Sequence, residues 1–182
     1  MPGRAAQPVF PKAVAAVFAG ADGGTAIGSV TPGTPLMPVA GFASGAARGQ
    51  VRLDGWSEQG GEAVVYPAPD QRVILARLTP QAMALRKVLG TKTDSFGTTW
   101  QHVEVSAWIA AADVVPDVSA VWDEAAQLYA AHCSSCHALH GPSEFTANAW
   151  PGVMRAMTAN AGLTPDQTTL ITRYLQANAH AP

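Results

Sequence analysis

The stretch Cys133-Ser134-Ser135-Cys136-His137 decides how this chain folds and what it carries. Two cysteines in C-x-x-C spacing, with a histidine directly after the second, form the attachment signature of a c-type haem. Each thiol adds to one vinyl group of the haem, and the adjacent histidine supplies an axial imidazole to the iron. The chain of 182 residues contains two cysteines, and both lie in this motif. The motif therefore predicts one covalent haem c on Cys133 and Cys136, with His137 as the proximal iron ligand.

The same C-x-x-C spacing also occurs in zinc sites, in thioredoxin-like dithiols and in plain disulfides. A zinc site needs two further Cys or His ligands at short, regular spacing, and His102, His132, His140 and His180 do not provide them. A thioredoxin-like dithiol lies beside a βαβ pattern, whereas a helical pattern leads into this motif. Covalent haem is the interpretation that the motif favours.

The composition is that of a globular chain. With 48% hydrophobic and 13% charged residues, it is long enough for one domain or two small ones. The net charge of −2 argues weakly against a nucleic-acid partner. No run of about twenty apolar residues is present, so we expect no membrane contact by this chain itself. The apolar run Val14–Ala19 is too short for a secretion signal, and because haem c is attached outside the cytoplasm, we expect a mature protein or an excised module.

The sequence pattern changes near Pro116. Before it, runs with β-branched residues alternate with turn signals, and one helical turn or two is expected within Thr79–Leu89. The clearest predicted strands are Arg52–Leu53, Val64–Tyr66, Val73–Leu75 and His102–Val105. After Pro116 the periodicity is helical. These patterns predict an α+β chain, in which residues 1–115 form a β-rich, SH3-like region and residues 116–182 a small all-α domain of the class I cytochrome c kind.

The β-rich region contains a weak internal repeat. Val51–Trp56 matches Val103–Trp108 in a V-x-h-x-x-W pattern, where h is apolar, and Val30–Pro32 resembles Leu78–Pro80. The matches lie 52 and 48 residues apart, so they nearly agree on one period. The repeat indicates two SH3-like units or one β domain made of two related halves, although short similarities also arise by chance in β-rich sequences. We expect Trp56 and Trp108, at matched positions, to be mostly buried.

Two helices should flank the haem. Asp117 is expected to cap a helix that presents one apolar face and runs directly into the C-x-x-C-H motif. The segment Thr164–Gln167 is a capping box with proline at the first helical position, and it should begin the last helix. We expect the two helices to cross near Tyr129 and Tyr174, forming one wall of the haem pocket.

The distal iron ligand is the open question. A helix between Thr146 and Ala159 carries Trp150, Val153, Met154 and Met157 on one face. A methionine on such a face is usually core, but a haem domain needs a group opposite His137, and a thioether is a common choice. Met157 is favoured because it lies just before the loop that leads to the last helix, whereas Met154, one turn earlier, is the second choice and is expected to pack.

The other histidines are weaker ligand candidates. His140 follows His137 by three residues, which span at most about 10 Å, too little to reach the opposite face of the haem. His132 is limited by similar geometry. His102 and His180 stay open for a bis-histidine site, although they are more simply exposed loop or tail residues.

The segments Trp108–Trp122, Tyr129–His140 and Phe145–Trp150 resemble the C-terminal portion of the TorC/DorC-type pentahaem cytochromes. Members of that family combine a membrane-anchored tetrahaem part with a β-rich segment and a single-haem domain. The resemblance implies electron flow from quinol, through a multihaem donor, to a periplasmic molybdenum reductase of N- or S-oxides. It also implies that Met157 is the distal ligand. This chain departs from the family pattern in lacking the anchor and the other four haem motifs.

Together these features predict a periplasmic electron-transfer protein and not an enzyme. No Ser/His/Asp set or carboxylate pair suggests a substrate site, and a haem with both axial positions filled has no room for O₂ or peroxide. The alternative is a haem enzyme or gas sensor whose distal position is open or displaceable.

Overall fold

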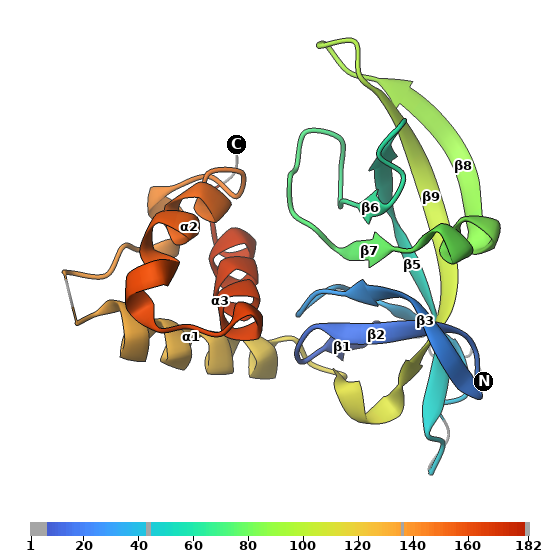
Figure 1. Cartoon of the computed structure of the whole chain (residues 1–182), viewed down its shortest axis with the longest axis horizontal. Helices are drawn as coiled ribbons and strands as arrows, with labels where there is room; N and C mark the ends of the chain where they lie inside the picture. The colour runs from blue at the N-terminus through green and yellow to red at the C-terminus, as the bar shows by residue number, and fades with distance from the viewer. Residues whose placement is uncertain (1–6, 43–44, 136, 181–182) are drawn as a thin grey trace, which may run out of the picture.

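The computed structural model describes residues 7–42, 45–135 and 137–180, with strands first and helices after them (Figure 1). The strands are β1 (Phe10–Pro11), β2 (Ala15–Gly20), β3 (Gly23–Val30), β4 (Met37–Ala40), β5 (Arg48–Glu58), β6 (Val64–Val65), β7 (Ala76–Leu78), β8 (Arg86–Thr93), β9 (Thr99–Ala110) and β10 (Val114–Val115). The helices are α1 (Ser119–Cys133), α2 (Trp150–Ala161) and α3 (Pro165–Ala177), with short 3₁₀ turns at η1 (Pro80–Leu85), η2 (Ala111–Asp113) and η3 (Pro142–Glu144). The predicted β-rich region followed by helices is confirmed. Within the described ranges, no helix is long and apolar enough to cross a bilayer.

The strands form one large antiparallel sheet that bends around its own core. The strand order is β4-β5-β9-β2-β3-β7-β6, with β8 also paired to β9, and β1 pairs separately with β10. Trp56 and Tyr66 exchange two backbone hydrogen bonds of 2.7 Å, which join the end of β5 to the residue after β6. A Cβ on Gly55 would meet Val65 Cγ1 at 2.6 Å and Tyr66 O at 2.7 Å, so this closure depends on a glycine at position 55.

The matched repeat segments lie side by side in this one sheet. Strands β5 and β9 pair along their whole lengths, from Arg48 opposite Ala110 to Glu58 opposite Trp100. The Val30 and Leu78 segments also fall on neighbouring strands, because β3 pairs with β7. Among the described residues the strands therefore form a single β part around one core, and not two separate units.

Trp56 and Trp108 are partly buried, but they lie on the outer face of the sheet and not in its core. Side chains alternate between the two faces of a strand, and each tryptophan follows its matched valine by five positions, so it lies on the opposite face. Val51 and Val103 are buried in the core, whereas both tryptophans are only half-buried on the outer face. Trp100 is the fully buried tryptophan of this sheet, covered by the Tyr66 ring at 5.8 Å and the Arg72 guanidinium at 5.1 Å.

One strand prediction in the β part fails. Val73–Leu75 is not a strand, since β7 begins at Ala76, although Val73 and Leu75 are buried. The helical turn expected within Thr79–Leu89 is the 3₁₀ helix η1, which ends at Leu85, and β8 starts at Arg86. Arg86–Val88 favours helix in isolation, but pairing with the long strand β9 outweighs that small preference.

The helical part has the expected local structure. The Asp117 carboxylate accepts the Ser119 N–H at 3.0 Å, just before α1 begins. At the start of α3, the Thr164 hydroxyl accepts the Gln167 N–H at 3.2 Å, and the Gln167 side chain accepts the Thr164 N–H at 2.9 Å. The predicted capping box is therefore confirmed. Helix α2 starts and ends later than expected, at Trp150 and Ala161.

The helices enclose two apolar clusters, and the partly buried Leu128 and Tyr174 pack against both. Tyr129 of α1 packs with Trp150 and Met154 of α2 and with Ile171 and Leu175 of α3. Tyr174 lies at the edge of this cluster, as expected from its predicted place near the crossing of α1 and α3.

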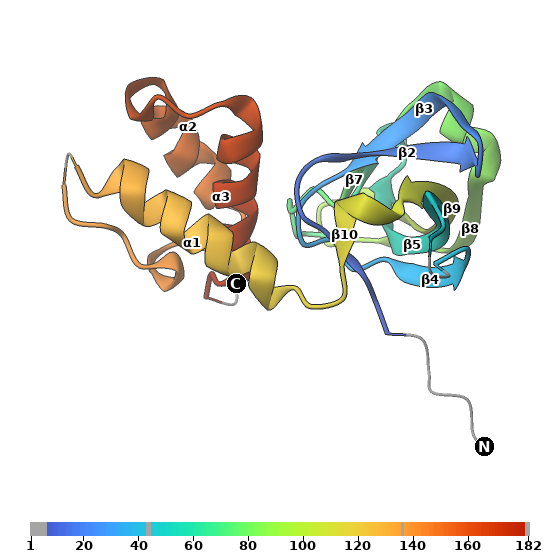
Figure 2. The ribbon, with the colours of Figure 1, turned by 90° about the horizontal axis from the view of Figure 1, so that it is seen from below.

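The helical part is tied to the β part by polar contacts. Asn148 donates to Asp70 O at 2.6 Å and accepts the Arg72 N–H at 2.7 Å. Arg173 Nε on α3 donates to the Thr31 hydroxyl at 3.1 Å. Helix α3 thus faces the β part, and α1 carries its last residues away from it (Figures 1 and 2).

Candidate functional site

The end of α1, the loop after it and the last turns of α2 enclose a small cavity. Cys133, His137 and Met157 line it together, and its volume is about 140 Å³. The remaining lining residues are His132, Ala156, Asn160 and Ala161. Cys133, His137 and Met157 were predicted from the sequence as site residues. Although Met157 lies on α2 and Cys133 on α1, all three meet at one cavity. Cys136 lies outside the described residues.

His137 is exposed and is oriented by its own loop. Its Nδ1 lies 2.6 Å from the Ala138 carbonyl oxygen. A proton on Nδ1 donates to this oxygen and leaves the lone pair on Nε2, which is the arrangement of metal-binding histidines. The side chain is therefore poised to coordinate a metal through Nε2.

The loop after His137 is held by hydrogen bonds from the helices. The Tyr129 hydroxyl donates to His140 O at 3.0 Å, and Trp150 Nε1 donates to Pro142 O at 2.9 Å. Burial is the main cause that raises the pKa of Tyr129, so its hydroxyl stays protonated and continues to donate at neutral pH. Two buried aromatic side chains thus fix the backbone of the loop.

Glu144 and a row of rings complete this support. The Glu144 carboxylate accepts from His140 Nδ1 at 2.7 Å and from the Gly141 N–H. The hydrogen bond with His140 is the largest cause of its lowered pKa, so the carboxylate is ionised at neutral pH. The rings of His137, His140, Phe145 and Trp150 follow one another at centroid distances of 5.3, 5.3 and 4.9 Å. Successive ring contacts therefore connect the exposed His137 to Trp150 in the core.

The two methionines of α2 have different surroundings. Met154 is 2% exposed and lies within the cluster of Trp150 and Ile171. Met157 is half-buried and lines the cavity. Met154 is therefore a core residue, whereas Met157, about one helical turn later, is a residue of the site.

The other histidines do not line this cavity, with one exception. His102 lies on β9, stacked on Trp56 and 2.9 Å from the Asp54 carboxylate. His180 Nδ1 lies 2.8 Å from Ser143 O, on the side of the helical part that faces the β part. The exception is His132, which the sequence analysis set aside as a ligand on geometric grounds.

His132 is a residue of the site that sequence reasoning missed. Its Nδ1 lies 3.1 Å from Ala161 O, so it links the end of α1 to the end of α2 across the cavity. Its position directly before Cys133 was the signal available in the sequence, but only the packing of α1 against α2 gives it a partner.

The chemistry of this site suits a c-type haem. A thiol, an imidazole and a thioether are the groups that attach haem c and fill its two axial positions, and all three border one cavity. The volume of about 140 Å³ is below the roughly 300–1,000 Å³ of typical cofactor pockets, so a haem would extend beyond it. Among the described residues, no group of three His, Cys, Asp or Glu side chains forms a metal site.

Comparison with known families gives the same assignment. The sequence profile described as "TorC third cytochrome c domain" matches residues 4–114, more than half of the chain. The chain belongs to the TorC family of c-type cytochromes. A second profile, described as "Dihaem cytochrome c", matches residues 129–182. This segment of the chain contains the haem motif Cys133–His137.

Individual relatives agree with the TorC profile. The cytochrome c-type protein TorY of Escherichia coli O157:H7 is 31% identical over 154 residues, which cover 84% of this chain and 41% of the relative. TorY of Haemophilus influenzae is 34% identical over 134 residues, 71% of this chain and 36% of the relative. TorC of E. coli O157:H7 is 30% identical over 132 residues, 71% of this chain and 34% of the relative. The matched part of this chain thus spans about two-fifths or less of these relatives, and no solved structure matches significantly.

The family membership confirms the prediction of a c-type cytochrome. It also confirms the resemblance on which the haem assignment partly rests.

Tyr129→Phe tests the support of the loop. Removal of the hydroxyl that donates to His140 O should lower the free energy of unfolding by about 0.5–1.5 kcal/mol, as measured by denaturant titration. Tyr174→Phe is the matched control, because the Tyr174 hydroxyl makes no hydrogen bond to the described residues, and it should change stability little. Equal losses in the two variants would contradict the role of the Tyr129 hydroxyl.

Proposed function

We propose that this chain is an electron-transfer module with one haem c. The haem is attached to Cys133 and Cys136, and its iron is held by His137 and Met157. The observation that carries the proposal is the single cavity lined by Cys133, His137 and Met157. When bound, the haem supplies a centre that accepts and donates one electron. The protein residues attach it, orient His137 through Ala138 O, and limit the access of water.

Met157 is proposed as the distal ligand in preference to Met154. Met154 is buried among Trp150 and Ile171, and turning it toward the haem would leave a hole in that core. Met157 already borders the cavity, so it is available without loss of packing.

A single haem is proposed from the cysteine count. Covalent attachment at the standard motif uses two cysteines, and this chain has two. The match to a dihaem profile over residues 129–182 covers only one C-x-x-C-H motif. A second haem in a dihaem relative would therefore have no attachment site of this type here.

The two parts of the chain are proposed to be two domains, residues 1–115 and 116–182. The β part is proposed to be SH3-like, which is supported by its large antiparallel sheet closed through Trp56 and Tyr66. The helical part is proposed to be a class I-like cytochrome c domain. Its support is the order of elements, with the haem motif directly after α1, the candidate distal methionine on α2, and α3 packed against both.

Electron exchange is proposed to occur at the end of α1. The haem motif lies at the end of the helical part that points away from the β part (Figures 1 and 2). His137 and Leu139 are exposed there. Because electron tunnelling falls steeply with distance, an exposed haem edge at this end allows a redox partner to approach closely.

The partners are proposed from the family resemblance. In this scheme a multihaem or quinol-linked donor in the periplasm reduces the haem, and the electron passes to a molybdenum reductase of N- or S-oxides, such as trimethylamine N-oxide. The similarity to TorC and TorY cytochromes supports this scheme. It makes the chain one relay in a respiratory pathway.

The haem attachment is tested by extraction under denaturing conditions. The intact chain should keep its haem through acid–acetone extraction, and its mass should exceed that of the polypeptide by one haem. Replacing both Cys133 and Cys136 with Ala should release the haem completely, while Ser134→Ala, between them, should not. Full extraction from the unmodified chain would exclude covalent attachment.

The two methionines are distinguished by their different effects on the spectrum. Met157→Ala should abolish the long-wavelength band of ferric, thioether-ligated haem, open the site to CO and lower the midpoint potential. Met154→Ala should keep the band but destabilise the fold by about 2–5 kcal/mol, the usual cost of deleting a core methionine side chain. Loss of the band in Met154→Ala alone would reverse the assignment. CO binding by the unmodified ferrous chain would favour a gas sensor or haem enzyme.

The acceptor is tested by stopped-flow reoxidation. The reduced full chain should be reoxidised by a molybdenum N-oxide reductase when trimethylamine N-oxide is present, and not when the oxide is omitted. A chain that is reoxidised by a small chemical oxidant but not by reductases of N- or S-oxides would contradict the proposed partner.

A further inference from the structure

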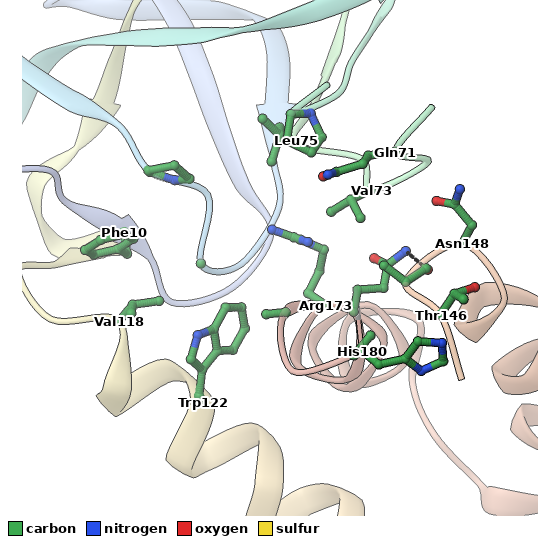
Figure 3. Close-up of a pocket in the computed structure, with 17 residues that line it drawn as sticks. Phe10, Gln71, Val73, Leu75, Val118, Trp122, Thr146, Asn148, Arg173 and His180 are labelled. Atoms are coloured by element: carbon green, nitrogen blue, oxygen red, sulfur yellow. Dashed lines mark hydrogen bonds between the residues drawn. The ribbon is translucent and has the colours of Figure 1, made fainter. Parts of the chain in front are cut away.

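A second and larger cavity lies where the helical part meets the β part. Its volume is about 580 Å³, within the range of pockets for small organic ligands. Figure 3 shows Phe10, Val73 and Leu75 on the β side and Val118 and Trp122 at the start of α1. None of the residues that line it belongs to the haem site.

A buried guanidinium reaches into this cavity. Arg173 projects from α3 toward the β part, as Figure 3 shows, and is 6% exposed. Its Nε donates to the Thr31 hydroxyl at 3.1 Å. The ion pairs among the described residues do not include Arg173. Burial lowers the pKa of Arg173 to about 10, so the side chain is still charged at neutral pH.

The surroundings of Arg173 lack negative charge. No Asp or Glu of the described residues lines the cavity. A smaller space of about 210 Å³ on the other side of Arg173 is lined also by Arg72 and Arg77, again without a described Asp or Glu. Arg72 already pairs with Glu58 at 3.1 Å, so within the described part of the chain Arg173 is the buried cation that lacks a counter-ion. A buried charge without a partner is costly, and an anion in the cavity would offset that cost.

We propose that this cavity binds a small organic carboxylate. The carboxylate pairs with the Arg173 guanidinium, which matches its planar, two-oxygen geometry. The apolar remainder of the ligand lies against Trp122, Val73 and Leu75. An organic ligand is favoured over an inorganic anion because the cavity is large and mostly apolar, with a single buried cation. The occupied site would join α3 to the β part without involving the haem.

Isothermal titration of the haem-containing full chain with benzoate tests this proposal. Benzoate should bind saturably, whereas benzamide, which has the same shape without the charge, should bind at least tenfold more weakly. Inorganic sulfate should not displace benzoate at equal concentration. The haem absorption spectrum should stay unchanged, which separates this site from the iron.

Variants locate the binding at Arg173. Arg173→Gln should weaken benzoate binding at least tenfold, and Arg173→Lys should weaken it less, because the charge remains but the paired geometry is lost. Arg155→Gln, on the exposed surface of α2, is the matched control and should bind as the unmodified chain does. Val73→Trp keeps the arginine but fills the cavity, so it should also abolish binding, whether or not Arg173→Gln folds.

Three outcomes would overturn the proposal. They are the absence of saturable benzoate binding to the unmodified chain, equal binding by the Val73→Trp variant, and equal binding of sulfate and benzoate. The last result would indicate a site for simple inorganic anions only.

Discussion

The packing of Tyr129 against Trp150, Met154, Ile171 and Leu175 is the contact on which the rest of the helical part depends. It fixes α1 relative to α2 and α3, and so decides that Cys133 and His137 at the end of α1 face Met157 near the end of α2. The same aromatic residues use their polar atoms to hold the loop after His137, through His140 O and Pro142 O. One apolar cluster therefore supports both the fold and the geometry of the site.

Helix α3 serves both parts of the chain. Leu170, Ile171 and Leu175 face α1 and α2, while Arg173 faces the β part and bonds to Thr31. A helix that is buried on two sides has little freedom to move, which is consistent with a rigid support for a haem. As a consequence, the charged side chain of Arg173 is buried where the helical part meets the β part.

The family comparison divides the chain in an instructive way. The profile described as a third cytochrome c domain matches residues 4–114, a stretch without cysteine. The haem motif instead lies under the dihaem profile. The match to the TorC profile thus covers the β part of this chain, whereas the haem-attachment motif lies in the helical part. The end of α1 that bears the motif points away from the sheet, so the β part does not cover the exposed side of the haem site.

The features that the residues alone predicted are those set by covalent spacing or by neighbours within one helical turn. Examples are the C-x-x-C-H motif, the Thr164–Gln167 capping box and the switch from strands to helices near Pro116. Long-range packing decided the rest, because it depends on which segments meet. It separated Met157 from Met154, gave His132 a partner on α2, placed Arg86–Thr93 in strand β8, and enclosed Arg173 between two parts of the chain. The orientation of Trp56 and Trp108 lies between the features set by local sequence and those decided by long-range packing. The alternation of side chains along a strand, counted from Val51 and Val103, already placed both tryptophans on the outer face, and only the depth of their burial required the tertiary structure.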